Sequence, residues 1–393
     1  MLKISERLSS VNPSATLAVK LEADRLRGQG VDIIDFGPGE PDFNTPENIK
    51  RAAHRAIDEN LSHYLATQGL PALRGAIRDH YRGLYGAEYG DNEVIVSCGG
   101  KGALFNAAMA LFGPGDEVII PAPYWVSFPE QVRLAGATPV IQSTRESDGF
   151  IARARDAEAL VTKATRCIIL CSPSNPTGAV IPQDELGRFA ELALRRDLYL
   201  IFDECYEKFL YDGLTHASLA SEHGRVRDRL ILVGTFSKSY AMTGYRVGYA
   251  VAAGPLISAM SVVQSHDTTH PTGVAQAAAL EAMTGPQHEM ERMIEEYCRR
   301  RDLIVPGLRS IPGVECLNPP GAFYAYPGVS GLYRRLGVND SIGVATVLLK
   351  DARIATVPGE AFGTPGYLRF SYALSAERIS EGIARFRRVV DGR

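Results

Sequence analysis

The chain of 393 residues is long for a single hydrophobic core, so we expect a large and a small domain. Its net charge of −3 argues against electrostatic binding to nucleic acid, and no apolar run approaches the length of a membrane span. The N-terminus lacks the apolar core of a secretory signal, and the six cysteines form no C-x-x-C pair. We therefore expect a reduced, cytoplasmic protein with no metal site and with neither nucleic acid nor membrane as a partner.

In chain order, the sequence predicts an N-terminal arm, then alternating helices and strands, then a mixed C-terminal lobe. Residues 1–45 predict an arm with a short strand over 31–36. The next expected elements are helices over 48–59 and 70–81, a strand over 94–96, a glycine-rich turn over 99–102 that opens a helix, and a strand ending at 121. Strands and helices alternate from there to about residue 250, which is typical of a mainly parallel sheet in an α/β fold.

The last hundred residues have a different pattern. A helix rich in arginine and glutamate over 287–308 should link the two domains. Beyond it, short apolar stretches predict an α+β lobe, at 321–326, 353–358 and 367–371.

Polar residues follow three of the expected buried strands: Asn175 after 166–171, Asp203 after 198–202 and Lys238 after 230–234. Open α/β sheets bind ligands at the carboxyl ends of their strands. A lysine there can form a Schiff base with an aldehyde, and Arg246, eight residues later, can hold a phosphate with its planar guanidinium. A carboxylate such as Asp203 can keep a pyridine ring cationic, so that the ring accepts electrons. An aldehyde and a phosphate on such a ring describe pyridoxal 5′-phosphate (PLP).

Each of these residues alone also fits a plainer role. A lysine after a strand is usually a solvated charge, and Ser237 with Lys238 would also suit a Ser-Lys hydrolase. Asp203 suits a helix N-cap, and Asn175 with the following proline suits an ordinary turn, with or without a cis peptide bond. The PLP interpretation depends on finding the three residues together, in this order.

The joint pattern resembles that of a known enzyme family. Its motifs are Ser174-Asn-Pro-Thr-Gly178, Asp203-Glu-Cys-Tyr206 and Ser237-Lys-Ser-Tyr-Ala-Met-Thr-Gly-Tyr-Arg-Val-Gly-Tyr249. They look like those of the class I/II aminotransferases of PLP fold type I, and more narrowly the bacterial aspartate aminotransferases. The resemblance implies a large domain (46–290) with a mainly parallel seven-stranded sheet flanked by helices, a small α+β domain (291–393), and an arm (1–45) that partly joins the small domain. It also implies a homodimer with shared active sites.

The resemblance further implies a role for each matching residue. Lys238 would carry the cofactor, Asp203 would pair with the ring nitrogen, and Asn175 and Tyr206 would contact the ring's phenolic oxygen. The implied phosphate ligands are Arg246, Gly100, Lys101, Thr235, Ser237 and, from the neighbouring subunit, the equivalent of Tyr64. The implied substrate contacts are Trp125, which would also stack on the ring, Asn175, Gly39 and, gripping the α-carboxylate, Arg369.

The same resemblance favours aspartate or glutamate, with oxaloacetate or 2-oxoglutarate, in a ping-pong transamination. Lys101 matches the lysine that serves the substrate's side-chain carboxylate, because residues 264–271 lack the arginine that another branch uses. Many relatives carry a lysine where this chain has Asn12, so binding of long dicarboxylates such as prephenate is in doubt, and aromatic or neutral amino acids stay open. His266 and His270 could alter the pocket or be structural. A PLP lyase, decarboxylase or oxidase, and a non-catalytic amino-acid binder, are the remaining alternatives.

Overall fold

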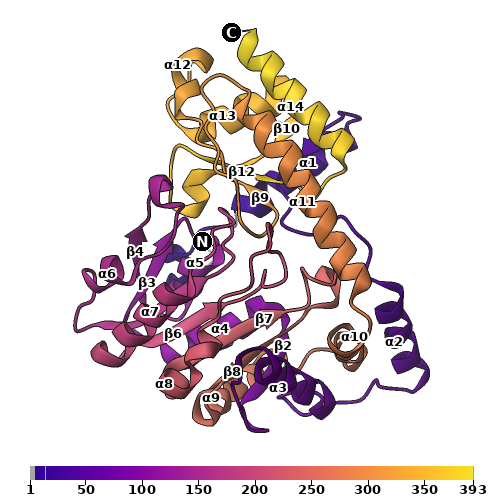
Figure 1. Cartoon of the computed structure of the whole chain (residues 1–393), viewed down its shortest axis with the longest axis vertical. Helices are drawn as coiled ribbons and strands as arrows, with labels where there is room; N and C mark the ends of the chain where they lie inside the picture. Colours follow the sequence, from indigo (N-terminus) through magenta and orange to yellow (C-terminus); the bar gives the residue numbers. More distant parts are fainter. Residues whose placement is uncertain (1–4, 14, 393) are drawn as a thin grey trace.

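A seven-stranded sheet forms the centre of the lower body in Figure 1, with the strand order β2-β8-β7-β6-β5-β3-β4. The structure, a computed structural model, describes residues 5–13 and 15–392. The strands are β2 (Val94–Cys98), β3 (Glu117–Ala122), β4 (Thr138–Ser143), β5 (Thr165–Cys171), β6 (Tyr199–Asp203), β7 (Leu230–Thr235) and β8 (Val247–Ala252). Only β8 runs antiparallel to its neighbours, β2 and β7. The predicted mainly parallel sheet is therefore confirmed.

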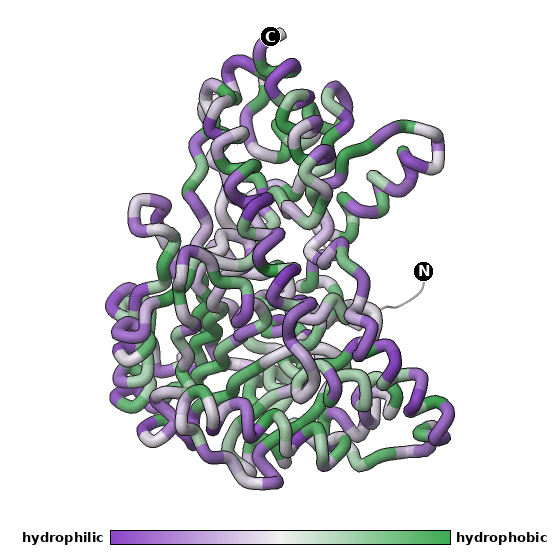
Figure 2. The backbone as a smooth tube through the Cα atoms, turned by 45° about the vertical axis from the view of Figure 1, so that its right-hand side comes forward, coloured by the Kyte–Doolittle hydropathy of each residue, from purple (hydrophilic) through white to green (hydrophobic). Residues whose placement is uncertain are grey.

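Both faces of this sheet are buried, because neighbouring residues of each strand enter different cores. Leu200, Phe202 and Leu232 belong to one apolar cluster, whereas Ile201 and Ile231 belong to another. The first cluster is covered by α2 (Glu47–Asp58), α3 (Pro71–Tyr85), α7 (Gln183–Arg196) and α10 (Gly273–Thr284). The second is covered by α4 (Gly99–Leu111), α5 (Ser127–Leu134) and α9 (Gly254–His266). In Figure 2 the hydrophobic segments accordingly gather inside this body and hydrophilic ones lie mainly at its rim.

The C-terminal part forms a second, smaller body at the top of Figure 1. The helix α11 (His288–Arg309) runs into it from the lower body, as the sequence predicts. An antiparallel sheet of order β11-β12-β9 lies within it, made of β9 (Tyr324–Ala325), β11 (Val357–Pro358) and β12 (Leu368–Ser371). Its other helices are α12 (Tyr333–Leu336), α13 (Ser341–Val347) and α14 (Ala376–Asp391).

The N-terminal segment reaches this smaller body through one short strand pair. The strand β1 (Ile34–Asp35) pairs in parallel with β10 (Ile354–Ala355). It is shorter than the predicted 31–36, because its partner offers only two residues for the ladder. The preceding helix, α1 (Ala15–Gly28), was not among the predicted elements, and it also contacts β10 and β11.

The remaining short elements connect these parts. They are α6 (Ala154–Glu158), α8 (His223–Val226), 3₁₀ turns at Glu6–Ser10, Glu146–Asp148, Leu219–Glu222, Arg227–Arg229, Thr243–Tyr245, Ser330–Leu332 and Gly359–Phe362, and a π-helical turn at Leu348–Ala352. Within the described residues, no helix has both the length and the apolar character needed to span a membrane. The domain boundaries at residues 45 and 290 stay a proposal, because the apolar cluster of the smaller body also takes in Tyr206, Phe209 and Tyr211 of the lower one.

Candidate active site

The carboxyl ends of β5, β6 and β7 meet at one edge of the sheet, and the residues that follow them line a common cavity of about 280 Å³. Asn175, Asp203 and Lys238 all face it. The cavity also takes in most of the other predicted residues: Gly39, Gly100, Lys101, Trp125, Tyr206, Thr235, Ser237, Arg246 and Arg369. Residues as distant in the sequence as Gly39 and Arg369 therefore line one site, which lies where the two bodies meet.

The amine of Lys238 lies in this cavity, with its side chain partly buried. Nζ donates a hydrogen bond to the carbonyl oxygen of Gly39 at 2.5 Å. Burial lowers the pKa of Lys238 below its ordinary value, and the positive charges of Arg369 and Arg246 act in the same direction. A lowered pKa increases the neutral fraction of the amine, which is the form that attacks a carbonyl carbon.

Asp203 ends β6 as a buried carboxyl group, 6% exposed, that faces the same cavity. The backbone N–H of Cys205 donates to Oδ1 at 3.0 Å, and no lysine or arginine forms an ion pair with Asp203 within the described part of the chain. Burial raises the pKa of Asp203 to about 7, and the neighbouring charge of Glu204 adds to this effect, whereas Lys238 opposes it. A buried carboxyl group without a cation fits a protonated pyridine nitrogen.

An anion cradle forms where α4 begins beside β7. Gly99 has φ +73°, and a Cβ atom added there would lie 2.7 Å from Nη2 of Arg246. Thr235 Oγ1 lies 3.0 Å from Ser237 Oγ, and Arg246 Nη1 donates to the Thr243 carbonyl at 2.9 Å. Arg246 makes no ion pair with a carboxylate among the described residues. Helix N-terminal amides, two hydroxyls and a guanidinium without a carboxylate partner together fit a phosphate group.

Arg369 is a buried guanidinium, 2% exposed, on β12. It donates through Nη1 to Asn175 Oδ1 at 3.0 Å and through Nη2 to the Gly37 carbonyl at 2.5 Å. Its carbon Cζ lies 4.7 Å from the ring centroid of Tyr324 and 5.1 Å from that of Phe362. Nε is buried without a partner in the described chain, and burial lowers the pKa of this group. An incompletely satisfied, buried cation fits a carboxylate ligand.

Tyr324 is a cavity residue that the sequence interpretation missed. Its hydroxyl lies 2.7 Å from the hydroxyl of Tyr206, and its ring packs under Arg369. The sequence around it, Gly321 to Tyr326, shows only a short apolar strand. No motif signal could have found Tyr324, because its place depends on the smaller body folding against the β6 end. Thr16, Leu104, Cys171 and Cys205 also line the cavity and were likewise not predicted.

Tyr64 is the one predicted residue that the structure places outside the cavity. It is 89% exposed, and its ring meets that of His270 edge-on, with centroids 6.0 Å apart. His270 has a structural place here: its Nε2 accepts the Leu65 N–H at 3.0 Å, and its Nδ1 lies 2.7 Å from the Pro271 carbonyl. Neither His266 nor His270 lines the cavity.

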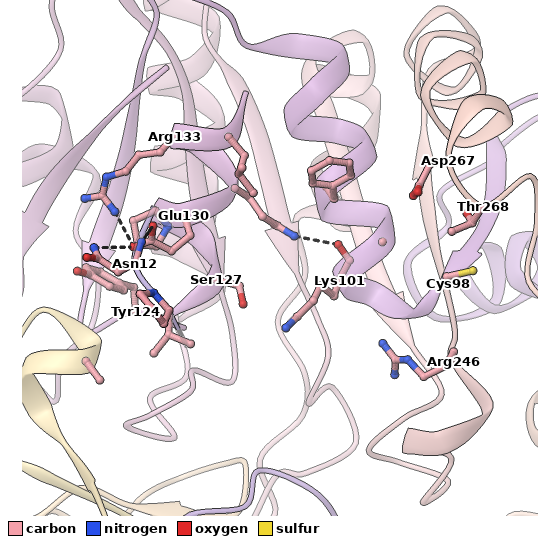
Figure 3. A pocket seen from close by; sticks show the side chains of 18 of the residues that line it. Asn12, Cys98, Lys101, Tyr124, Ser127, Glu130, Arg133, Arg246, Asp267 and Thr268 are labelled. Atoms are coloured by element: carbon pink, nitrogen blue, oxygen red, sulfur yellow. Dashed lines mark hydrogen bonds and ion pairs between the residues drawn. The ribbon is translucent and has the colours of Figure 1, made fainter. Parts of the chain in front are cut away.

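A second cavity, of about 630 Å³, adjoins the first and shares Lys101 and Arg246 with it. Figure 3 shows both side chains pointing toward the same space, while Asn12, Glu130 and Arg133 gather on another wall. Glu130 accepts hydrogen bonds from the backbone N–H of Asn12 at 2.9 Å and from Arg133 at 2.7 Å. Lys101 Nζ lies 5.0 Å from the Trp125 ring centroid, and burial together with the Arg246 charge lowers the pKa of Lys101.

The chain is similar over nearly its whole length to known proteins. The aspartate aminotransferase of Bacillus sp. (strain YM-2) is 41% identical over 387 residues, which is 98% of this chain and 99% of that protein. The probable aspartate/prephenate aminotransferase of Aquifex aeolicus is 41% identical over 99% of this chain and 98% of that protein. The solved aspartate aminotransferase of Thermus thermophilus with maleate matches with a TM-score of 0.94 at 40% identity, over 99% of this chain and 100% of that chain.

A family model described as aminotransferase class I and II matches residues 31–386, which is most of the chain. The family likeness, the α/β fold and the aminotransferase activity predicted from the sequence are confirmed by these matches. The chain therefore belongs to the class I and II aminotransferases, a family of PLP-dependent enzymes.

Proposed function

We propose that this aminotransferase exchanges the amino groups of L-aspartate and L-glutamate with their 2-oxo acids. The observation that carries the proposal is the presence of two cations, Arg369 and Lys101, in one cavity with the Lys238 amine. Neither cation forms an ion pair with a carboxylate in the described chain. A dicarboxylic amino acid offers two anionic groups around one amine, which suits this arrangement. The relatives from Bacillus and Thermus, both named aspartate aminotransferases, support the same substrate.

Within this proposal, each cavity residue has a distinct task toward PLP. Arg246, Thr235, Ser237 and the amides of Gly100 and Lys101 would hold the phosphate, while Asp203 would hold a proton on the ring nitrogen. Asn175 and Tyr206 would contact the phenolic oxygen, and Trp125 would cover the ring and exclude water. When bound, PLP supplies a conjugated cationic ring that withdraws electrons from the substrate's Cα.

The chain's own side chains bind the substrate and move the proton. Arg369 orients the α-carboxylate, helped by the backbone at Gly39, and Lys101 attracts the side-chain carboxylate. Burial lowers the pKa of Lys238 and so increases the neutral fraction of its amine, and Nζ would accept the proton from the substrate Cα and later return it. A substrate without an α-carboxylate would leave Arg369 unpaired, so simple amines would react poorly.

We further propose that long dicarboxylates such as prephenate bind weakly. Asn12 carries no charge, and its backbone N–H and side-chain amide both donate to Glu130, at 2.9 and 3.3 Å. Among the described residues, the only cation at that wall of the second cavity is Arg133, which is itself paired with Glu130. The Aquifex relative, named a probable aspartate/prephenate aminotransferase, is the protein against which prephenate binding should be compared.

We infer that the enzyme is a cytoplasmic homodimer in which each subunit completes the other's site. The exposure of Tyr64 supports the dimer, since a ring that is 89% exposed suits a contact made across an interface. The six cysteines are free, which suits a reducing compartment. Sedimentation of the purified enzyme, with mixed Tyr64→Phe and Lys238→Ala subunits assayed for partial activity, tests the shared site.

A half-reaction screen tests the proposed reaction. PLP-loaded enzyme is mixed with each of the twenty L-amino acids, and the formation of pyridoxamine phosphate is followed by absorbance and chromatography. We expect aspartate and glutamate to react fastest, with asparagine and glutamine as uncharged controls of matched size. Lys238→Ala should form no pyridoxamine phosphate at a measurable rate. Release of CO₂, or product formation without pyridoxamine phosphate, would favour a decarboxylase, lyase or oxidase instead.

A further inference from the structure

Directly behind Asp203, a second buried carboxyl group turns away from the cofactor cavity. Glu204 is 2% exposed and does not line that cavity. Its backbone N–H donates to the Val233 carbonyl at 2.9 Å, which continues the pairing of β6 with β7 by one residue. Successive residues of an extended chain point to opposite sides. Asp203 therefore faces the cavity while Glu204 faces the core of the large body.

Two side chains hold the Glu204 carboxylate in place. His216 Nε2 lies 2.9 Å from Oε1, and the Tyr81 hydroxyl donates to Oε2 at 2.9 Å. Tyr81 comes from α3, and His216 comes from the loop after β6, where its ring stacks on Phe202 with centroids 6.3 Å apart. Nδ1 of His216 is buried and has no partner among the described residues. Within the described residues, Glu204 is therefore the hydrogen-bond partner of the His216 imidazole.

Packing does not require an acid at this position. Burying a carboxylate is costly, and an apolar side chain of similar size would fill the same space without that cost. What distinguishes Glu204 is its position: it directly follows Asp203 in the chain, at the end of β6. We propose that Glu204, held by His216 and Tyr81, is a positioning residue that fixes the turn carrying Asp203 and places a second negative charge behind it. This inference rests on the proposed role of Asp203 toward the ring nitrogen.

Several other titratable groups face the two carboxyl groups. Those that act on Asp203 are Glu204, Lys238, Cys171 and Cys205. Those around Glu204 are Tyr81, Tyr85, Tyr89, Tyr249 and His216, with Glu207 and its partner His80 beyond. Burial raises the pKa values of these tyrosines and thiols, so they are neutral near pH 7. Glu204 therefore adds negative charge at Asp203, and Lys238 adds positive charge.

The test is an infrared titration of the full-length protein, freed of cofactor and labelled with ¹³C at its aspartate carboxyl groups. The Asp203 band is identified by its absence from the spectrum of Asp203→Asn. In the wild type its midpoint should lie at about 7. In Glu204→Gln, which keeps the shape but removes the charge, the midpoint should fall by about one pH unit. An unchanged midpoint would overturn the proposal.

Two variants separate charge from simple disruption of the core. Tyr81→Phe removes the other hydrogen bond to the same carboxylate but no charge, so the midpoint should stay near the wild-type value. His216→Gln keeps a donor to Glu204 and removes a group able to carry positive charge, so the midpoint must not fall. A fall in either variant as large as in Glu204→Gln would also refute the idea. His216→Gln keeps the test decisive if Glu204→Gln does not fold.

The holoenzyme gives a second readout. With PLP labelled with ¹⁵N in its ring, Glu204→Gln should move the nitrogen resonance toward that of a neutral pyridine, whereas Tyr81→Phe should not. The titration above needs neither cofactor nor substrate, so a failure of the proposed transamination would show only in the half-reaction screen. A normal half-reaction together with an unchanged Asp203 midpoint would reject the role of Glu204 and leave the proposed function standing.

Discussion

Replacing Asp203 by asparagine should stabilise the cofactor-free protein at neutral pH, even though it should abolish activity. Asp203 is 6% exposed, and burial raises its pKa from 3.8 to about 7. A carboxyl group whose pKa is raised on folding stabilises the folded state below the unfolded pKa, and that contribution is lost as the pH rises through the folded pKa. The wild-type protein therefore loses stability between about pH 4 and pH 7, and the asparagine variant does not.

The size of the effect follows from the shift. A change of about three pH units corresponds to about 4 kcal/mol, which is an upper limit because water in the cavity can solvate the ionised group. Urea unfolding of the two cofactor-free proteins at several pH values measures it. We expect the free energies of unfolding to diverge in favour of Asp203→Asn as the pH rises from 4 to 7, and to run parallel above pH 8.

A surface residue, Asp32, provides a control in which the carboxyl pKa is lowered on folding rather than raised. Asp32 binds Arg378 and Arg385 through hydrogen bonds, which hold its pKa below the usual range. A lowered carboxyl pKa gives stability above the unfolded pKa that is lost on acidification, so Asp32→Asn should be less stable than the wild type near pH 7, with the gap closing in acid. If Asp203→Asn instead showed the same trend as Asp32→Asn, or no pH dependence, the buried-acid reasoning would be wrong.

Three further predictions concern the cavity. Arg369→Lys keeps the charge but loses the planar fork, so kcat/KM for aspartate should fall by about 10- to 100-fold, while the slow reaction of β-alanine, which lacks the α-carboxylate, should change little. An effect below twofold on aspartate would contradict the assigned contact. Gly99→Ala would force a Cβ atom against Arg246 at φ +73°, so equilibrium dialysis should show weaker PLP binding and unfolding should show a loss of about 1 kcal/mol or more. Lys101→Met should lower the preference for aspartate over alanine by about tenfold in competing half-reactions, and an unchanged preference would exclude Lys101 as the side-chain contact.

Much of the large body was predictable because its sequence signals are local. The strands β5, β6 and β7 are continuous apolar runs, as expected for strands covered on both faces, and polar residues end them. The carboxyl ends of parallel strands share one edge, so Asn175, Asp203 and Lys238 had to lie near one another once the sheet was recognised. The glycine-rich start of α4 was also visible, since such a turn leaves backbone amides free.

The residues that the smaller body contributes to the cavity were not predictable from local signals in the sequence. Tyr324 and Arg369 lie on short strands whose pattern says nothing about a cavity lined mainly by residues far earlier in the chain. The resemblance to the family identified Arg369 as a substrate contact. Its burial, and the missing partner of its Nε, appear only in the folded chain. The hydrogen bond from Arg369 to Asn175 joins residues that are 194 positions apart.

The amino-acid sequence by itself determined the sheet, the chemistry at its strand ends and the family, because these depend on residue type and on neighbours along the chain. Tertiary structure alone decided which charges are left without partners. Burial and long-range contacts set the pKa of Asp203, leave Nε of Arg369 unsatisfied and tie Asn12 to Glu130. Those quantities depend on which distant groups exclude water from a site, and only the packed chain contains that information.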